Sequence, residues 1–261
     1  GVQGASSREE DFVEHLFVAN THSYILFFTD RGKCYWVKVY DIPEGGRAAK
    51  GRAIVNLIGC DPEEKVSAFI SVKEFNEDHF VVMATEKGMV KKTKLSAYSN
   101  PRKKGIYAVE IREGDRLIEA RVSTGDNDIL LGTRNGKSIR FSEEQIRASG
   151  RKTMGVKGIT LSSEDDKLVG MLLIKRDGTV LVATEKGFGK RTEISQYRAQ
   201  KRGGKGVLTM KTTDKVGKMV TIKEVVEKDD LMIITNQGVL IRLPVSQIRS
   251  IGRATQGVKL I

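Results

Sequence analysis

The sequence has few of the residues that more specialised protein classes depend on. Its two cysteines, Cys34 and Cys60, lack zinc-motif spacing, so we expect two reduced thiols of a cytosolic protein and no disulfide framework. Its three histidines, His15, His22 and His79, share neither metal-ligand nor catalytic-triad spacing. No apolar run approaches the ~20 residues that span a bilayer, and the N-terminus does not resemble a signal peptide. We expect a soluble protein without a metal site.

Aromatic residues, prolines and sustained helical patterns are also scarce. Aromatic side chains make up 6% of the chain and do not alternate with basic ones, so stacking on single-stranded bases has little support. None of the four prolines interrupts an apolar run, and no segment keeps a helical period, which favours strands. There is no Walker loop, and acidic pairs such as Asp165-Asp166 are typical of exposed loops. We therefore expect an all-β, non-catalytic chain that holds no cofactor.

What the sequence does contain is a repeat, the pattern Thr-x-x-Gly, in five copies. The glycines are separated by 56, 48, 51 and 51 residues, and a period near ~50 residues is typical of stacked or radially arranged units. An apolar run before each turn and a mixed run after it predict a hairpin with a buried first strand. A later glycine, usually followed by a β-branched residue, predicts a further strand. The turn glycines are Gly32, Gly88, Gly136, Gly187 and Gly238; the later glycines are Gly51, Gly105, Gly155, Gly206 and Gly257.

Several strands in each unit favour a propeller-like ring over a helical solenoid. Uniform copies predict a single domain over residues 1–261, with five complete repeat cores. The pair Gly1-Val2 matches the later glycine and the β-branched residue that follows it in other copies, so we expect the chain to begin at the tail of an earlier copy. A ring of six blades is therefore the alternative to five.

Positive charge gathers in the same part of every copy, in a chain of net charge +12. In a radial arrangement, equivalent positions recur around the ring, so the basic segments would merge into a stripe along one rim or face. Such a stripe is typical of a protein that binds a polyanion running past every unit, and duplex phosphates are the expected target. The alternative is that these charged runs are ordinary solvent-exposed faces without a binding role. Segments 32–51, 88–105, 136–155, 187–206 and 238–257 carry +2, +6, +3, +5 and +3.

The position four residues after the turn glycine is basic in four copies, and only Trp36 breaks the series. A basic residue at the same position of four copies favours a common role in contacting the polyanion over randomly placed surface charge. A second basic feature is the heptad Gln200-Lys201-Arg202-Gly203-Gly204-Lys205-Gly206, whose glycines would let the backbone approach a phosphate while its cations release counterions. Its plainer interpretation is a flexible polar turn. The phased cations are Lys92, Arg140, Arg191 and Arg242.

The heptad matches the Q-R/K-R-G-G-R/K-G signature known as the gyrase-A box. Along its full length the chain resembles the C-terminal domain of the A subunit of bacterial DNA gyrase. In that family the box usually lies in the first blade, shortly before the Glu-Glu-Asp-Phe stretch, so the heptad at 200–206 is a second or displaced box. The resemblance is carried by Glu9-Glu10-Asp11-Phe12, Val18-Ala19-Asn20-Thr21-His22, Gly51-Arg52-Ala53-Ile54-Val55-Asn56-Leu57, Val90-Lys91-Lys92-Thr93, Gly187-Phe188-Gly189-Lys190-Arg191-Thr192 and Gly252-Arg253-Ala254-Thr255-Gln256-Gly257-Val258.

The resemblance implies a β-pinwheel, a propeller-like ring whose blades exchange strands, with DNA bent or wrapped around its basic rim so that gyrase can introduce negative supercoils. It places the cleavage domain, ATP and Mg elsewhere in the parent enzyme. Its implied partners are double-stranded DNA, the remainder of the gyrase A subunit, and the gyrase B subunit, in an A2B2 assembly in the bacterial cytoplasm, associated with the nucleoid. The isolated domain is expected to be a monomer without membrane contact.

Two alternatives stay open. A domain like that of the topoisomerase IV C subunit would bind DNA and steer substrate choice without strong wrapping. A propeller-like enzyme or interaction scaffold would hold converging polar residues at a central site. Sequence preference on DNA should be slight, because the repeats offer backbone contacts and few base-reading side chains. The residues expected to contact DNA are Gln200, Lys201, Arg202, Gly203, Gly204, Lys205, Gly206, Lys190, Arg191, Lys91, Lys92, Lys103, Lys104, Arg140, Arg151, Lys152, Arg242 and Arg253.

Overall fold

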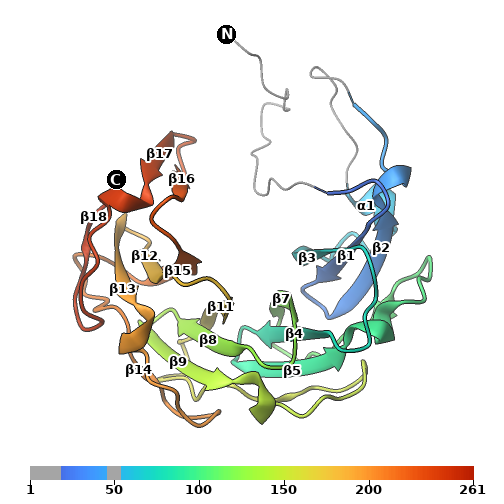
Figure 1. Cartoon of the computed structure of the whole chain (residues 1–261), viewed down its shortest axis with the longest axis horizontal. Coiled ribbons are helices and arrows are strands. Elements are labelled where there is room, and N and C mark those ends of the chain that lie inside the picture. Colours follow the sequence, from blue (N-terminus) through green and yellow to red (C-terminus); the bar gives the residue numbers. More distant parts are fainter. Residues whose placement is uncertain (1–18, 46–53) are drawn as a thin grey trace.

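The computed structural model describes residues 19–45 and 54–261 as a row of antiparallel sheets that follow one another along an arc (Figure 1). Every sheet is built around one of the predicted hairpins. The first strands of the hairpins are β1 (Tyr24–Thr29), β4 (Phe80–Thr85), β8 (Asp128–Thr133), β12 (Thr179–Thr184) and β16 (Asp230–Ile234). The second strands are β2 (Lys33–Lys38), β5 (Met89–Lys94), β9 (Lys137–Ser142), β13 (Phe188–Glu193) and β17 (Leu240–Pro244).

Each of the first four hairpins gains one strand on either side, which makes a four-stranded blade. The inner strands line the concave side of the arc, and short outer strands complete the blades. From inside to outside, the strand order is β3-β1-β2-β6 in blade 1, β7-β4-β5-β10 in blade 2, β11-β8-β9-β14 in blade 3 and β15-β12-β13-β18 in blade 4. The added strands are β3 (Val66–Val72), β7 (Leu117–Ser123), β11 (Leu168–Ile174), β15 (Met219–Val225), β6 (Ile106–Tyr107), β10 (Val156–Lys157), β14 (Val207–Leu208) and β18 (Val258–Lys259).

The blades exchange strands, as a pinwheel does. The outer strand of each blade comes from the chain that follows the next hairpin: β6 comes after β5 in sequence, yet its Tyr107 pairs with Lys33 of β2. A short 3₁₀ turn follows the second strand of every hairpin. The turns are η1 (Val39–Asp41), η2 (Leu95–Tyr98), η3 (Glu143–Gln145), η4 (Ile194–Gln196) and η5 (Val245–Gln247), and one short helix, α1 (Ile54–Ile58), precedes β3.

The repeat glycines are required by the backbone. Gly32 closes the first hairpin at φ 84°, where a Cβ atom would lie 2.3 Å from the Val109 carbonyl oxygen. Gly206 precedes outer strand β14 at φ 75°, and its Cβ would lie 2.3 Å from the Ser138 carbonyl oxygen. Both glycines therefore allow a conformation and a close approach that a side chain would prevent.

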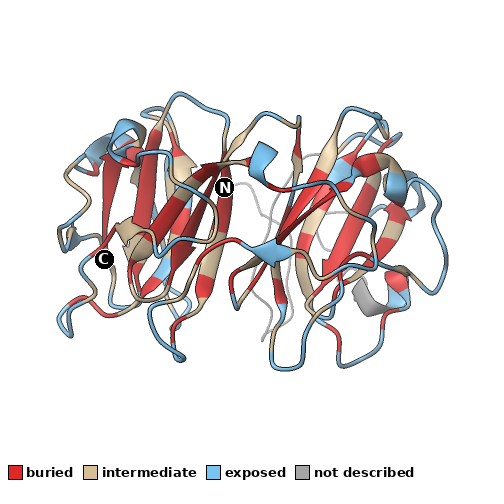
Figure 2. Cartoon of the chain, turned by 90° about the horizontal axis from the view of Figure 1, so that it is seen from below, coloured by how far each residue is buried: buried red, intermediate tan, exposed pale blue. Residues whose placement is uncertain are grey.

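The apolar core lies between neighbouring blades, where the central strands are buried (Figure 2). Phe28 of blade 1 meets Tyr98 of η2 edge to face, with ring centroids 5.8 Å apart. Cys34 and Cys60 are buried free thiols. None of the helices in the described residues is long and apolar enough to cross a membrane.

The fifth repeat core is smaller than predicted. Its described residues form only the hairpin β16–β17, whereas five complete cores were expected. The inner and outer strands of each earlier blade come from chain well beyond its own hairpin, so a repeated turn does not guarantee a complete blade. The predicted steps at Gly1-Val2 and Gly51 lie outside the described residues.

Candidate nucleic-acid interface

The phased position after the turn glycine supplies hydrogen-bond donors between blades. In the first four copies, its side chain reaches a backbone carbonyl in or beside the 3₁₀ turn of the next blade. Trp36, which breaks the series of charges, makes the same bond through its indole N–H, so the shared property is an N–H donor and not a charge. The bonds run from Trp36 Nε1 to Tyr98 O (2.7 Å), Lys92 Nζ to Glu143 O (3.1 Å), Arg140 Nη1 to Tyr197 O (3.1 Å) and Arg191 Nε to Ile248 O (2.8 Å).

Two lysines one position earlier are buried in the same way. Lys91 Nζ donates to the carbonyl oxygens of Ala108 (2.5 Å) and Arg151 (2.6 Å). Lys190 Nζ donates to the carbonyl oxygens of Gly252 and Arg253 and to Thr255. The pKa of Lys91 is lowered to about 7 and that of Lys190 to about 8, mainly by burial and also by the charge of a nearby arginine, Arg151 and Arg253 respectively.

This burial corrects the expectation for Lys91, Lys92, Lys190 and Arg191 as surface contacts. Their exposed fractions are 1%, 6%, 0% and 4%, and their donors are directed at protein carbonyls. Loop carbonyls buried between blades need donors, and a long basic side chain supplies them. Arg140 is partly buried and also forms an ion pair with Asp128 (2.9 Å). These side chains link the blades to one another.

A second set of arginines lies on the crossing loops, the segments that run from a 3₁₀ turn back to the outer strand of the previous blade. On the three loops that lead to β10, β14 and β18, an arginine bonds the outer strand of one blade further back. Arg151, Arg202 and Arg253 occupy equivalent positions, are half-buried, and each donates from Nη1 to the carbonyl of the second residue of an outer strand. Arg202, the arginine of the heptad, thus bonds the loop that leads to blade 3 to the outer strand of blade 2. The acceptors are Tyr107 O at 3.1 Å, Lys157 O at 2.7 Å and Leu208 O at 2.9 Å.

The heptad at 200–206 is an ordered part of the loop that runs from η4, after blade 4's hairpin, to β14, the outer strand of blade 3. Its backbone is anchored at several points: Gln200 N donates to Arg140 O (2.7 Å), and Gly203 N donates to Gly158 O (2.9 Å). Gly203 O accepts the Thr160 hydroxyl at 2.7 Å. Gly203 has φ 85° and Gly206 φ 75°, so these two glycines serve the backbone path, whereas a side chain at Gly204 would make only ordinary contacts. Of the heptad cations, Lys201 and Lys205 are exposed.

The exposed members of the predicted set lie mainly on the crossing loops and beside the outer strands. Arg242 differs, because it lies on the fifth hairpin with its Nε 3.8 Å from Asp230. Lys152 Nζ lies 5.8 Å from the centre of the Tyr107 ring. The exposed predicted cations are Lys103, Lys104, Lys152, Lys201, Lys205 and Arg242.

Three exposed arginines were missed by sequence reasoning. Arg147, Arg198 and Arg249 lie 51 residues apart, each just after a 3₁₀ turn, at the start of a crossing loop. Within the described residues, their side chains form no hydrogen bond or ion pair. Their spacing was visible in the sequence, eleven residues after the turn glycines of the last three copies. Together with the exposed lysines, they give the crossing loops a recurring set of free cations.

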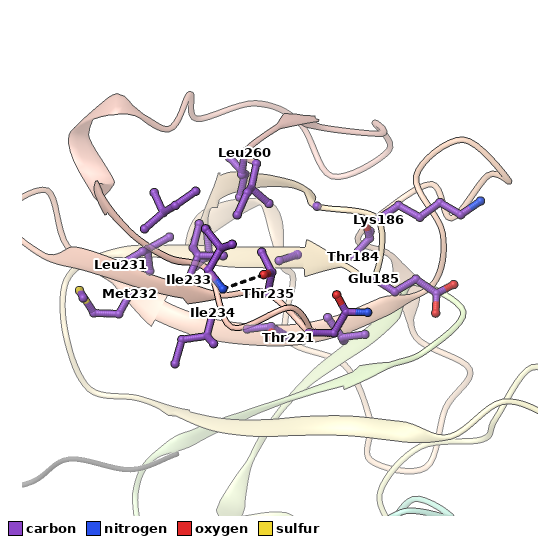
Figure 3. A pocket seen from close by; sticks show the side chains of 18 of the residues that line it. Thr184, Glu185, Lys186, Thr221, Leu231, Met232, Ile233, Ile234, Thr235 and Leu260 are labelled. Carbon is purple, nitrogen blue, oxygen red and sulfur yellow. Dashed lines mark hydrogen bonds between the residues drawn. The ribbon is translucent and has the colours of Figure 1, made fainter. Parts of the chain in front are cut away.

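A hollow of about 850 Å³ lies between blade 4 and the fifth hairpin (Figure 3). Aliphatic side chains such as Leu231 and Leu260 line much of it, and its charged lining residues are Glu185, Lys186 and Lys223. Among the described residues, no group of three His, Cys, Asp or Glu side chains could hold a metal ion.

Repeated four-stranded sheets with exchanged outer strands define a β-propeller-type domain of the pinwheel kind. A family model described as "DNA gyrase C-terminal domain, beta-propeller" matches residues 23–73, 79–124, 127–175, 178–225 and 229–261. The chain belongs to this DNA gyrase C-terminal domain family.

Curated relatives and solved structures agree with this family. The DNA gyrase A subunit of Clostridium acetobutylicum is 48% identical over the whole chain, and that of Salmonella typhimurium is 43% identical. The chain spans 31% and 30% of the length of these two relatives. It is similar to the C-terminal domain of DNA topoisomerase IV (TM-score 0.85, 25% identity, 92% of this chain and 75% of that one). It also shares its fold with a DNA gyrase A C-terminal domain (TM-score 0.81, 21% identity, 100% and 88%).

Proposed function

We propose that this chain binds duplex DNA along the outer side of its arc and bends it, as a non-catalytic part of a DNA gyrase A subunit. The observation that carries the proposal is the set Arg147, Arg198 and Arg249, which presents one exposed, unpaired guanidinium in each of the last three repeats. A guanidinium without a protein partner can take a phosphate oxygen and release a counterion. Regular spacing along the arc matches a ligand whose charges are also regularly spaced.

The energetic requirement for bending is modest. Bending a site of about 20–30 bp by tens of degrees costs on the order of 1–6 kcal/mol, which several phosphate contacts offset. The donors that link the blades make the arc a rigid template, because each crossing loop is bonded to two blades. A rigid basic arc favours a bent duplex over a straight one, since only the bent form meets every cation.

Within the parent protein, we propose that this bending presents a second stretch of the same DNA to the cleavage machinery, so that the enzyme introduces negative supercoils. Strand cleavage, ATP and Mg belong to other domains or to the B subunit of an A2B2 assembly in the bacterial cytoplasm, and this domain holds no cofactor. The curated relatives are named as A subunits of DNA gyrase, which favours this function over the topoisomerase IV alternative.

The test is the salt dependence of binding to a duplex of about 30 bp. The triple variant Arg147→Gln, Arg198→Gln and Arg249→Gln should lower the slope of log K against log salt by about 0.9 for each lost phosphate contact. The control variant removes three exposed arginines that are paired with carboxylates. Its changes are Arg31→Gln, Arg116→Gln and Arg176→Gln, whose partners are Glu63, Glu86 and Asp229.

The two variants lose the same formal charge, so they separate a defined path from general attraction. A slope that falls only in the first variant supports the proposed path. Equal losses in both would mean that net charge alone attracts DNA. Bending or wrapping is tested separately by the linking-number change after nicked circular DNA is sealed in the presence of the protein.

A further inference from the structure

Tyr107 is a large aromatic residue exposed among the free cations. It is the second residue of β6, the outer strand of blade 1, and 53% of it is exposed. Its carbonyl oxygen accepts a hydrogen bond from Arg151 Nη1, which anchors the backbone beneath the ring. The ring therefore stands on an anchored strand and is accessible to a binding partner.

Cations from two blades approach the ring. Lys33 Nζ, from β2 of the same blade, lies 5.9 Å from the ring centre, and Lys152 Nζ, from the crossing loop after blade 3's hairpin, lies 5.8 Å from it. Both are within the range of a cation–π contact. The ring therefore lies at a junction of three chain segments, with ammonium groups on two of them.

The equivalent residues on the other outer strands differ in kind. Lys157 on β10 and Lys259 on β18 are exposed cations, whereas Leu208 on β14 is partly buried. Two equivalent positions therefore present a cation on the outer side of the arc. Blade 1 replaces that cation with an aromatic ring and supplies the charge from Lys33 and Lys152 beside it.

We propose that Tyr107 is a non-ionic contact for bound duplex DNA, its ring lying against sugar and base edges in a groove between phosphates held by Lys33 and Lys152. This inference rests on the proposed DNA binding. Phosphates attract the two ammonium groups, and the exposed ring between them then loses water on contact with the apolar sugar and base edges. Aromatic and apolar side chains that enter a groove favour a local bend, so the ring marks a preferred bend at blade 1.

The contact is distinguished from a charge contact by its salt dependence. Tyr107→Ala should weaken binding to a duplex of about 30 bp roughly tenfold at every salt concentration, with the slope of log K against log salt unchanged. Tyr107→Phe, which keeps the ring, should bind as the original protein does. Lys152→Gln should instead reduce the slope by about 0.9.

Tyr40 provides the matched control. It is 81% exposed, lies on η1, and takes part in none of the lysine–ring contacts found in the described residues. Tyr40→Ala should leave affinity unchanged. Equal urea midpoints for all variants would show that folding is intact, and cross-linking of Tyr107 to bromodeoxyuridine in the unaltered protein's complex would report the contact without a substitution.

Three results would overturn the inference. Unchanged affinity of Tyr107→Ala would mean that the ring does not touch DNA, and a reduced slope would mean that it only positions the lysines. Failure of the original protein to bind duplex DNA would remove the proposed function and this contact together. Normal binding with an unaffected Tyr107→Ala variant removes the contact alone.

Discussion

Two arginines of the same blade should behave in opposite ways when each is replaced by methionine. Arg191 is buried, with Nε 2.8 Å from the Ile248 carbonyl oxygen, whereas Arg198, seven residues later, is exposed and unpaired. Arg191→Met leaves a buried carbonyl without its donor, which costs about 1–3 kcal/mol in addition to the lost charged hydrogen bond. The ion pair with Glu227 adds little, because that carboxylate is 71% exposed. Methionine also removes the cost of burying a charged guanidinium, which offsets part of the loss. We therefore expect about 2–4 kcal/mol of destabilisation.

Arg198→Met should change the free energy of unfolding by less than about 0.5 kcal/mol. Urea unfolding measures the change in stability. The slope of log K against log salt for duplex binding, taken under conditions where both variants stay folded, measures the loss of phosphate contacts. The slope should fall by about 0.9 for Arg198→Met and stay unchanged for Arg191→Met. If Arg191→Met kept full stability and lost slope, the side chain would contact phosphate and the structural assignment of Arg191 would be wrong.

Three further predictions concern the crossing loops and the buried lysines. Gly206→Ala should destabilise the protein by more than about 1 kcal/mol, because its Cβ would meet a carbonyl at 2.3 Å; a urea midpoint equal to that of the original protein would contradict this. Burial lowers the pKa of Lys190 from its ordinary value of 10.5 to about 8, so between these values the unfolded chain binds more protons and the free energy of unfolding should rise with pH. Lys190→Met should remove that rise, as urea midpoints at pH 8 and 10 would show. Replacing both Lys201 and Lys205 with Gln, while keeping the inter-blade hydrogen bond of Arg202, should reduce the linking-number change on sealed circular DNA without altering the urea midpoint.

The hairpins and their turns could be predicted from the sequence because their cause is local. Gly32 has positive φ, as the turn glycine does in all five copies, and a side chain on it would also meet a carbonyl oxygen. The sequence therefore has a glycine at the same place in every copy. Strand exchange is different: Tyr107 pairs with Lys33 across a long stretch of chain, and no local pattern encodes that partner. It was expected only through the resemblance to a known family.

The periodic cations show a limit of repeat analysis. A period identifies positions that do the same thing in every copy, but it does not say which side of the sheet they face. A buried carbonyl and a phosphate both call for an N–H donor on a long side chain, so the sequence alone could not separate Arg191 from Arg198. Trp36 was the informative exception, since an indole can satisfy a carbonyl and cannot neutralise a phosphate.

The exchange of outer strands also sets the order in which the domain can be made. Lys33 cannot pair with Tyr107 until the whole second hairpin has been synthesised, which at about 5–20 residues per second is a delay of several seconds. Every later blade waits in the same way for the hairpin after it, so maturation runs one unit behind the ribosome. During that interval the second strand of the newest hairpin presents an unpaired edge, and a ribosome that stalled between units would leave the last edge open to pairing with another nascent chain.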